Sequence, residues 1–223
     1  MIRKRVLIVD DYPVVRDGLV SCIESTDYFS VCGTAATAAE ALGAVKDLKP
    51  DLAVIDLSLP DRHGLELIRD LDGSVRMLVL SMHEERDYAE RALNRGAHGY
   101  IMKGEPTDKV LSAMREVAEG RRYLSEAMTQ RMLEIATRRG GRSSTERLTD
   151  RELEVFERIG NGMTTAQIAE ELGLATKTIE TYRENIKAKL ELQNATELVR
   201  AGVLWVEGLQ RDRNVPPGGA PTA

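Results

Sequence analysis

The organising segment of this sequence is Leu52-Ala53-Val54-Ile55-Asp56-Leu57-Ser58-Leu59-Pro60. Four apolar residues run directly into one aspartate, Asp56. A short, continuous apolar run is typical of a strand that is buried on both faces of a parallel sheet. In an open sheet of this kind, ligands bind beyond the carboxyl ends of the strands. Asp56 is therefore either a polar residue that ends a strand or a functional carboxylate. The residues that follow the other strands distinguish the two.

Polar residues also follow three of the other predicted strands. Hydrophobic patterning predicts five strands that alternate with helices, at residues 6–9, 29–34, 52–55, 76–80 and 99–102. This alternation implies a parallel sheet with helices on both faces, so the carboxyl ends of its strands share one edge. The residues that follow the first, fourth and fifth strands are Asp10 with Asp11, Ser81 and Lys103. Three carboxylates at one edge would repel each other unless a cation lay among them, and carboxylate oxygens suit Mg²⁺.

Each of these residues also has an ordinary structural explanation when it is considered alone. Asp10 or Asp11 could cap a helix that starts near Pro13. Ser81 could cap the helix predicted from residue 84, and Lys103 could be an exposed turn residue. The combination of all of them at one sheet edge is what favours a functional site.

The composition describes a globular protein with a modest negative charge. The chain has 223 residues, is 42% hydrophobic and carries a formal net charge of −5, which does not favour non-specific binding to nucleic acid or to an anionic membrane. Its two cysteines, Cys22 and Cys32, have no metal-type spacing and suggest a reducing compartment. No apolar run reaches the ~18 residues that a membrane span needs, and no signal peptide is evident. We therefore expect a cytoplasmic protein with no membrane partner.

The rest of the chain predicts a connector, a small helical domain and a tail. Residues 123–139 have apolar residues at helical spacing and precede a polar, glycine-rich linker. Four helices are then predicted, the first of which has a capping box formed by Thr149 and Glu152. The predicted limits are residues 1–121 for the α/β domain, 122–147 for the connector helix and flexible linker, 148–208 for the helical domain and 209–223 for a disordered tail.

The first domain resembles the receiver domain of a two-component response regulator. The resemblance rests on Asp10-Asp11, on Asp56-Leu57-Ser58-Leu59-Pro60, on Leu80-Ser81 and on Lys103, each after its predicted strand. It implies a flavodoxin-like (βα)5 fold with strand order 2-1-3-4-5.

The resemblance also implies a chemistry for each residue of the set. Asp56 would accept a phosphoryl group from a sensor histidine kinase, a use of a carboxylate as a nucleophile. Mg²⁺ would be held by Asp11, Asp56 and the backbone carbonyl of Ser58, with Asp10 acting through a water. Lys103 and Ser81 would contact the phosphoryl oxygens, and Tyr100 would be the switch aromatic whose burial follows. Ser58 and His83 would flank the path of the hydrolytic water.

The second domain resembles the LuxR-type helix-turn-helix of the NarL/FixJ regulators. The matching segments are Leu148-Thr149-Asp150-Arg151-Glu152, Gly162-Met163-Thr164-Thr165-Ala166-Gln167-Ile168-Ala169, Lys177-Thr178-Ile179-Glu180-Thr181, Lys189-Leu190 and Thr196-Glu197-Leu198-Val199. A pair of short helices joined by a glycine-containing turn places its second helix in the major groove of DNA. Without these matching segments, the same pair of helices would be read as part of an ordinary helical bundle.

The resemblance assigns DNA contacts to the third predicted helix. Glu180, Thr181 and Glu184 would face the base edges. The residues that would touch phosphates or support these contacts are Thr176, Lys177, Thr178, Tyr182, Arg183 and Lys187. Tyr182 stands where the family commonly has histidine, which leaves its phosphate contact less secure. Residues 147–208 hold eight Lys and Arg against eleven Asp and Glu, so binding has to rely on a local basic stripe and on dimerisation.

The predicted function is a phosphorylation-controlled transcriptional response regulator that binds promoter DNA as a homodimer. A possible dimer face on the fourth helix consists of Leu198, Val199, Gly202 and Trp205, although these residues could instead form the core of the domain. One rival function is a Mg²⁺-dependent phosphatase with Asp56 as nucleophile; Ser58, where such enzymes usually have a second carboxylate, argues against it. A second rival is a pseudo-receiver that acts only as an interaction platform.

Overall fold

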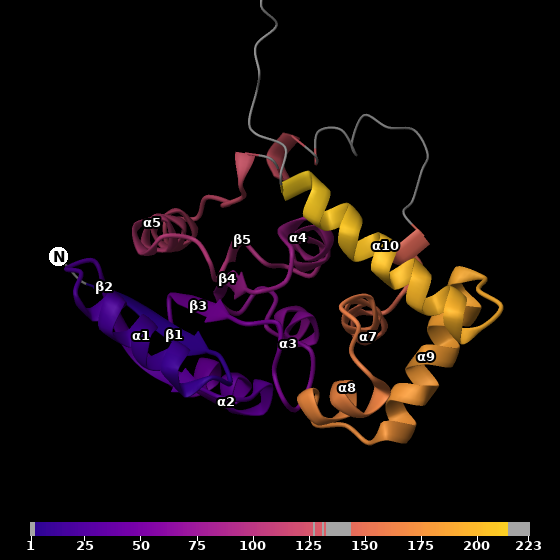
Figure 1. Ribbon diagram of the computed structural model, residues 1–223. Coiled ribbons are helices and arrows are strands. Elements are labelled where there is room, and N and C mark those ends of the chain that lie inside the picture. Colours follow the sequence, from indigo (N-terminus) through magenta and orange to yellow (C-terminus); the bar gives the residue numbers. More distant parts are fainter. Residues whose placement is uncertain (1–2, 127, 131, 133–143, 214–223) are drawn as a thin grey trace, which may run out of the picture. The chain divides into compact units, whose positions relative to one another are not determined.

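The chain folds into two compact units, Met1–Arg139 and Gly140–Ala223 (Figure 1). The computed structural model describes residues 3–126, 128–130, 132 and 144–213. Within these residues, no helix combines the length and the apolar character that a membrane span requires.

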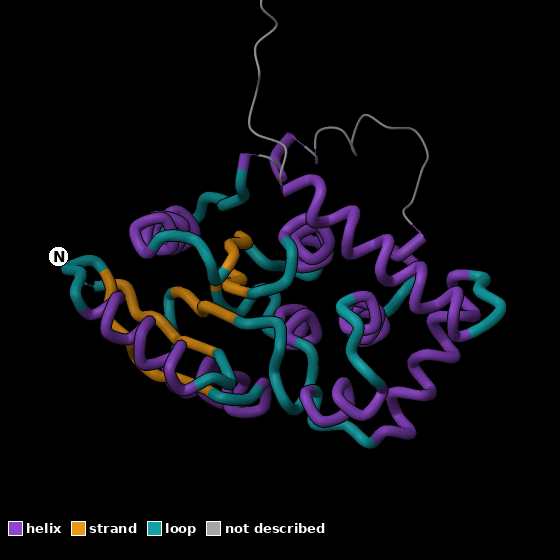
Figure 2. The backbone as a smooth tube through the Cα atoms, viewed as in Figure 1, coloured by secondary structure: helices purple, strands orange, loops and turns teal. Residues whose placement is uncertain are grey.

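The first unit is built on a five-stranded parallel sheet (Figure 2). Its strands, in the spatial order β2-β1-β3-β4-β5, are β1 (Lys4–Val9), β2 (Phe29–Ala35), β3 (Leu52–Ile55), β4 (Arg76–Ser81) and β5 (Gly99–Met102). The register pairs Val9 of β1 with Ile55 of β3, so the residues that follow these two strands emerge side by side. The predicted strand order is confirmed.

Helices cover both faces of this sheet. They are α1 (Pro13–Glu24), α2 (Ala38–Leu48), α3 (Gly64–Asp70), α4 (Glu85–Asn94) and α5 (Thr107–Ala118). One cluster of buried residues joins Val6 and Ile8 of β1 to Ile23 of α1 and Met114 of α5. Successive strand residues point to opposite faces, and Leu7 between them is fully buried as well. Burial on both faces explains why the strands read as continuous apolar runs.

The loop after β3 is hydrogen-bonded to the N-terminus of α2. The Asp61 carboxylate accepts hydrogen bonds from the backbone N–H groups of Ala38 and Ala39, both at 2.9 Å. The Thr37 side chain, the N-cap of α2, accepts a hydrogen bond from the backbone N–H of Glu40. Partial burial raises the pKa of Asp61, but these backbone hydrogen bonds outweigh it and hold the pKa below its usual value. Asp61 therefore acts as a helix cap supplied from a distant loop.

The segment after α5 differs from the prediction. A helix was expected from residue 123, but Tyr123 instead forms a parallel bridge with Gly99 of β5. The open edge of β5 offers unpaired backbone groups, and Tyr123 satisfies them before any helix can start. Residues 126, 128–130 and 132 are helical. The remainder of the expected connector helix and most of the glycine-rich linker lie outside the described residues.

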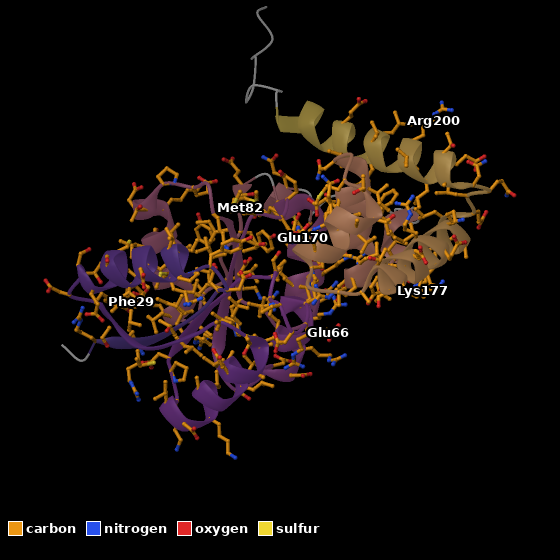
Figure 3. All side chains as sticks on the ribbon, turned by 60° about the horizontal axis from the view of Figure 1, so that its bottom comes forward. Phe29, Glu66, Met82, Glu170, Lys177 and Arg200 are labelled. Carbon is orange, nitrogen blue, oxygen red and sulfur yellow. The ribbon has the colours of Figure 1, made fainter. Side chains whose placement is uncertain are left out.

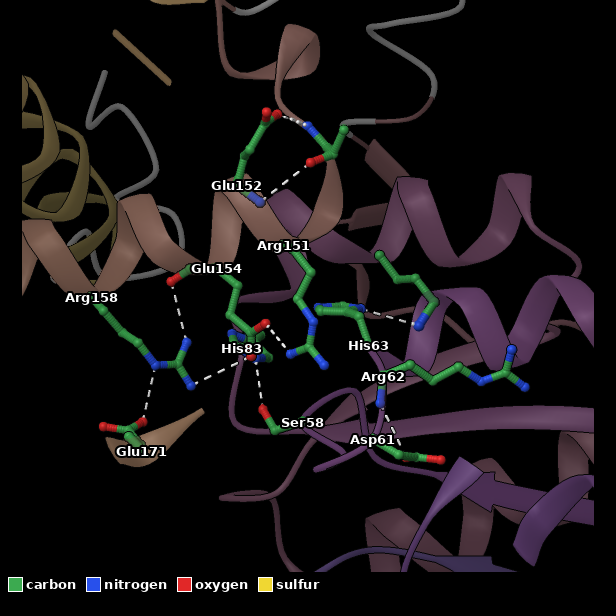
Figure 4. A network of polar contacts seen from close by, with 12 residues as sticks. Ser58, Asp61, Arg62, His63, His83, Arg151, Glu152, Glu154, Arg158 and Glu171 are labelled. Atoms are coloured by element: carbon green, nitrogen blue, oxygen red, sulfur yellow. Dashed lines mark hydrogen bonds and ion pairs between the residues drawn. The ribbon is translucent and has the colours of Figure 1, made fainter. Parts of the chain in front are cut away.

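The second unit is helical. Its elements are η1 (Ser144–Arg147), α7 (Asp150–Gly160), α8 (Thr165–Glu171), α9 (Thr176–Leu190) and α10 (Ala195–Arg213). The predicted capping box of Thr149 and Glu152 is present at the start of α7 (Figure 4). Lys189 of α9 extends this box, since its Nζ lies 2.6 Å from Glu152 Oε2. Burial raises the pKa of Glu152, but the hydrogen bonds from Lys189 and Thr149 outweigh it and lower the pKa.

Helices α7 and α10 approach each other at a pair of glycines. A Cβ on Gly160 would fall on the carbonyl oxygen of Gly202 and lie 2.6 Å from Val206 Cγ2. Nearby, the ring centroids of Phe156 and Trp205 are 5.6 Å apart. At this crossing, Gly202 and the fully buried Leu198 pack inside the unit, which favours the alternative that these residues form the core of the domain. Of the predicted face, Val199 is 40% exposed, and Leu204, which was not predicted, is 57% exposed.

The end of α10 lies beyond the predicted limit of the helical domain. A disordered tail was expected from residue 209, but the helix continues to Arg213. Leu209, Gln210 and Arg211 are good helix formers, and the first prolines come later, at Pro216 and Pro217. Residues 214–223 of the expected tail lie outside the described residues.

Replacing Asp61 by Ala should lower the free energy of unfolding of the first unit by about 1 kcal/mol, the usual value of a helix cap. Because folding lowers the pKa of Asp61, its contribution is present above the pKa of an unfolded Asp and is lost as pH falls through the lowered value. Urea unfolding of the native chain and of Asp61→Ala at neutral and acidic pH would measure this. Asp47→Ala, which changes an exposed aspartate near the other end of α2, is the control; equal effects would contradict the capping role.

Replacing Gly160 by Ala should destabilise the second unit by about 1–3 kcal/mol, because the new methyl group has no room beside α10. The matched control is Gly43→Ala in the interior of α2, where a Cβ meets nothing within 4 Å. There, the better helix propensity of Ala should stabilise the fold by about 0.5–1 kcal/mol. Thermal unfolding of both variants should therefore show shifts of opposite sign, and a neutral Gly160→Ala would contradict the close crossing.

Candidate functional site

The three predicted carboxylates meet at the carboxyl edge of the sheet. Asp10 and Asp11 follow β1 and Asp56 follows the neighbouring strand β3, so the parallel register brings them together. One ligand atom from each lies within 4.8 Å of the others. Asp10 and Asp56 are almost completely buried, at 2% and 3% exposure. The backbone N–H groups of Tyr12 and Leu57 donate to them at 3.0 and 2.7 Å and fix their orientation.

Lys103, which follows β5, neutralises part of this negative charge. Its Nζ lies 2.7 Å from Asp10 Oδ2 and 2.8 Å from Asp56 Oδ2. One ammonium thus holds two buried carboxylates side by side. The Tyr12 ring also lies over this ammonium, with its centroid 5.8 Å away. Lys103 is therefore part of the site and not an exposed turn residue.

Burial and mutual repulsion shift the pKa values of the site. Burial raises the pKa of Asp56, and Lys103 counteracts only part of this effect. Burial opposes the charge on Lys103 too, but the attraction of Asp56 and then Asp10 outweighs it and raises the pKa of Lys103. The pKa of Asp11 is raised by burial and by the charges of Asp56 and Asp10. The site therefore holds more negative charge than Lys103 alone can stabilise.

Asp11 has a carboxylate oxygen that makes no hydrogen bond. Its Oδ1 is buried and has no hydrogen-bond partner. A buried, unpartnered carboxylate oxygen beside two further carboxylates is a poor arrangement unless a cation completes it. Hard oxygen donors of this kind fit a divalent cation such as Mg²⁺. The described residues thus form a cluster consistent with a metal site.

Ser81, His83 and Tyr100 form the next layer of the site. Ser81 is fully buried, and its Oγ accepts a hydrogen bond from the His83 backbone N–H at 3.3 Å. Tyr100 is buried, and its hydroxyl donates to the His83 carbonyl oxygen at 2.8 Å. The switch aromatic predicted to become buried on phosphorylation is thus already buried in this structure.

The structure also shows a contact that sequence reasoning did not predict. Ser58 and His83, two residues after Asp56 and Ser81 respectively, join through Oγ and Nε2 at 3.0 Å (Figure 4). The His83 ring packs on Tyr88 of α4, with centroids 4.5 Å apart. Spacing marked Ser58 and His83 as neighbours of the site, but only the fold shows that they bind each other. Nothing in the sequence marked Tyr88.

A second candidate site lies on α9 in the helical unit. Its exposed residues include Thr176, Lys177, Glu180, Thr181 and Glu184, five of the predicted DNA contacts. Figure 3 shows Lys177 projecting outward from α9. The other predicted contacts, Thr178, Tyr182, Arg183 and Lys187, are half-buried and flank this exposed face. The preceding helix α8 and the turn at Gly173, which has a φ of +63°, complete the predicted helix-turn-helix.

Comparison with known proteins identifies both domains. Residues 6–115 match the family model described as response regulator receiver domain, and residues 146–201 match bacterial regulatory proteins, luxR family. The transcriptional regulatory protein MctR of Rhizobium johnstonii is 34% identical over 199 residues, covering 88% of this chain and 91% of that protein. The DNA-binding transcriptional activator DevR/DosR of Mycobacterium tuberculosis is 34% identical over 221 residues, 97% of this chain and 99% of that protein.

Solved structures show the same architecture. A LuxR-family two-component response regulator from Aurantimonas is 33% identical, with a TM-score of 0.56 over 61% of this chain and 100% of that chain. The RcsB response regulator of Salmonella typhimurium, at 22% identity, shares the fold with a TM-score of 0.64 over 92% of this chain and 98% of that chain. The chain therefore belongs to the NarL/FixJ family of two-component response regulators, which are transcription factors and not catalytic enzymes, with a receiver domain followed by a LuxR-type helix-turn-helix domain.

Proposed function

We propose that Asp56 is the phosphoacceptor through which a sensor histidine kinase controls binding of this protein to promoter DNA. The observation that carries the proposal is the Asp10–Asp11–Asp56 cluster, two of whose members are buried and bound to Lys103. A carboxylate oxygen of Asp56 would attack the phosphorus of a phosphohistidine. The new P–O bond forms as the P–N bond breaks, and the imidazole of the kinase leaves.

The surrounding residues have defined roles in this transfer. The donor set fits Mg²⁺, which Asp11, Asp56 and the carbonyl oxygen of Ser58 would hold, with Asp10 acting through a water. When bound, it would neutralise charge on the transferring group. Lys103, now bound to Asp10 and Asp56, would turn to a phosphoryl oxygen as a fixed positive charge. Ser81 would donate its hydroxyl to another oxygen.

The phosphoryl group acts through the loop that follows β4. Ser81, His83 and Tyr100 are already joined by hydrogen bonds, so a movement of Ser81 toward the phosphate displaces this whole loop. The added charge would favour a state in which two copies of the chain dimerise on two half-sites of DNA. DNA binding is supported by the exposed face of α9 and by the description of the 34% identical DevR/DosR as a DNA-binding transcriptional activator.

We further propose domain limits and a location that fit this role. The receiver domain would span residues 1–121, the connector and linker 122–147 and the DNA-binding domain 148–208. Both the kinase's phosphohistidine and the promoter are found in the cytoplasm, where this protein would act. A pseudo-receiver that never accepts a phosphoryl group is the alternative that the following measurements separate from this proposal.

Mg²⁺ should stabilise the native chain against heat. At a Mg²⁺ concentration 100 times the Kd, the gain is about 2.7 kcal/mol in the free energy of unfolding. Asp11→Asn should lose most of this gain, whereas Asp47→Asn on the surface of α2 should keep it. Because the pKa of Asp11 is raised, protons should compete with Mg²⁺ at a higher pH than for an ordinary aspartate. Equal stabilisation of the native chain and Asp11→Asn would contradict the assigned ligand.

Incubation with acetyl phosphate and Mg²⁺ should add one phosphoryl group to the native chain and none to Asp56→Ala. Intact-mass spectrometry measures the adduct, with Asp47→Ala as the control that removes an aspartate elsewhere. The phosphorylated chain should then bind a duplex selected from a random library more tightly than Asp56→Ala after the same treatment. An adduct without tighter binding would refute the coupling, and no adduct from acetyl phosphate or from a kinase would indicate a pseudo-receiver.

A further inference from the structure

The exposed face of the second helix of the helix-turn-helix is acidic. Glu180 and Glu184 lie one turn apart on α9, and both are exposed, with 53% and 72% of their side chains accessible. Thr181 lies between them, and its hydroxyl donates to the carbonyl oxygen of Lys177 at 3.0 Å. In a helix-turn-helix, the N-terminal part of this helix contacts base edges. Glu180 lies in that part of α9 and Glu184 follows one turn later on the same face, so both carboxylates lie on the face that would read the bases.

Each carboxylate has a lysine partner on the same helix. Lys177 Nζ lies 3.2 Å from Glu180 Oε2, and Lys187 Nζ lies 2.9 Å from Glu184 Oε2. The Lys177 pair is wide open to solvent, with 86% of the lysine side chain exposed, and such pairs cost little to break. When DNA approaches, its phosphates compete for Lys177 and, to a lesser extent, for Lys187, whose side chain is 19% accessible. Transfer of the lysines to phosphates would leave each glutamate free to accept from a base.

The bases differ in how they receive a carboxylate. In the major groove, cytosine presents the N4 amino donor, whereas guanine presents only the O6 and N7 acceptors. Thymine presents an acceptor and a methyl group. Adenine presents a donor beside the N7 acceptor, which suits an amide better than a carboxylate. A glutamate thus favours cytosine, and a glutamine in its place favours adenine.

We infer that Glu180 and Glu184 are the specificity-determining residues of this protein and that they select cytosines in each half-site of the operator. The inference rests on the proposed DNA-binding function and adds the identity of the bases. The acidic face also makes binding more selective: the phosphates of every sequence repel the carboxylates, and only cytosine at the right positions offsets that cost. Lys177 and Lys187 restrain the carboxylates in the free protein and contact phosphates in the complex.

The test is selection of duplexes from a random library by the phosphorylated full-length chain. The native chain should enrich half-sites with cytosine at two positions. Glu180→Gln should change the preference to adenine at one of these positions, and Glu184→Gln at the other. For duplexes that differ only there, the ratio of affinities for cytosine over adenine should fall by roughly 5- to 150-fold. Glu to Gln preserves size and helix propensity, and circular dichroism checks that each variant is folded.

Glu170→Gln is the matched control, because Glu170 is exposed on α8 and its replacement removes the same charge from the same unit. It should bind more tightly to DNA in general without any change of preferred base. If the native chain enriches a sequence but neither variant changes the preferred base, the inference is overturned and the proposed function stands. If the native chain enriches no sequence, the DNA-binding function itself fails, and the inference fails with it.

Discussion

One ammonium group holds the centre of the receiver domain together. Lys103 binds Asp10 and Asp56 at once, at 2.7 and 2.8 Å, in a place where both carboxylates are nearly inaccessible to water. Removing this ammonium would leave two buried carboxylates side by side without compensation. The order of the strands makes the arrangement possible, since β3 lies beside β1 and the residue after β5 reaches across to both. A cation bound among the three carboxylates would relieve their mutual repulsion.

Much of this architecture could be predicted from the sequence because the strands are short, apolar and buried on both faces. The segments that contain Asp10, Asp56 and Lys103 end at a sheet edge that parallel topology must gather into one place. Capping chemistry was equally local, as for Thr149 and Glu152, whose box is present as expected. Periodicity and spacing are properties of the chain itself, so features that depend on them can be read without coordinates.

The features that the sequence could not show depend on contacts between distant segments. Tyr123 lies on the edge of β5 because that edge has free backbone groups, which helical spacing after residue 123 cannot show. Leu198 and Gly202 belong to the crossing of α10 with α7, and a single apolar stripe could not tell an internal face from a dimer face. The pairing of Ser58 with His83 likewise requires two loops to meet. Asp61 shows the same limit, since its role depends on α2 being within reach.

The contact of Lys189 with Glu152 has a consequence for the thermodynamics of DNA binding. This lysine is held at 2.6 Å by a carboxylate that is only 4% exposed, so it completes the junction of α9 with α7 and is not available to displace ions from a phosphate. Each phosphate that a protein neutralises contributes about −0.9 to the slope of log affinity against log salt. A helix with one of its three lysines engaged in this way releases fewer counterions than its sequence suggests. Ionic strength should then tune the affinity of this regulator less steeply than a count of its basic residues implies.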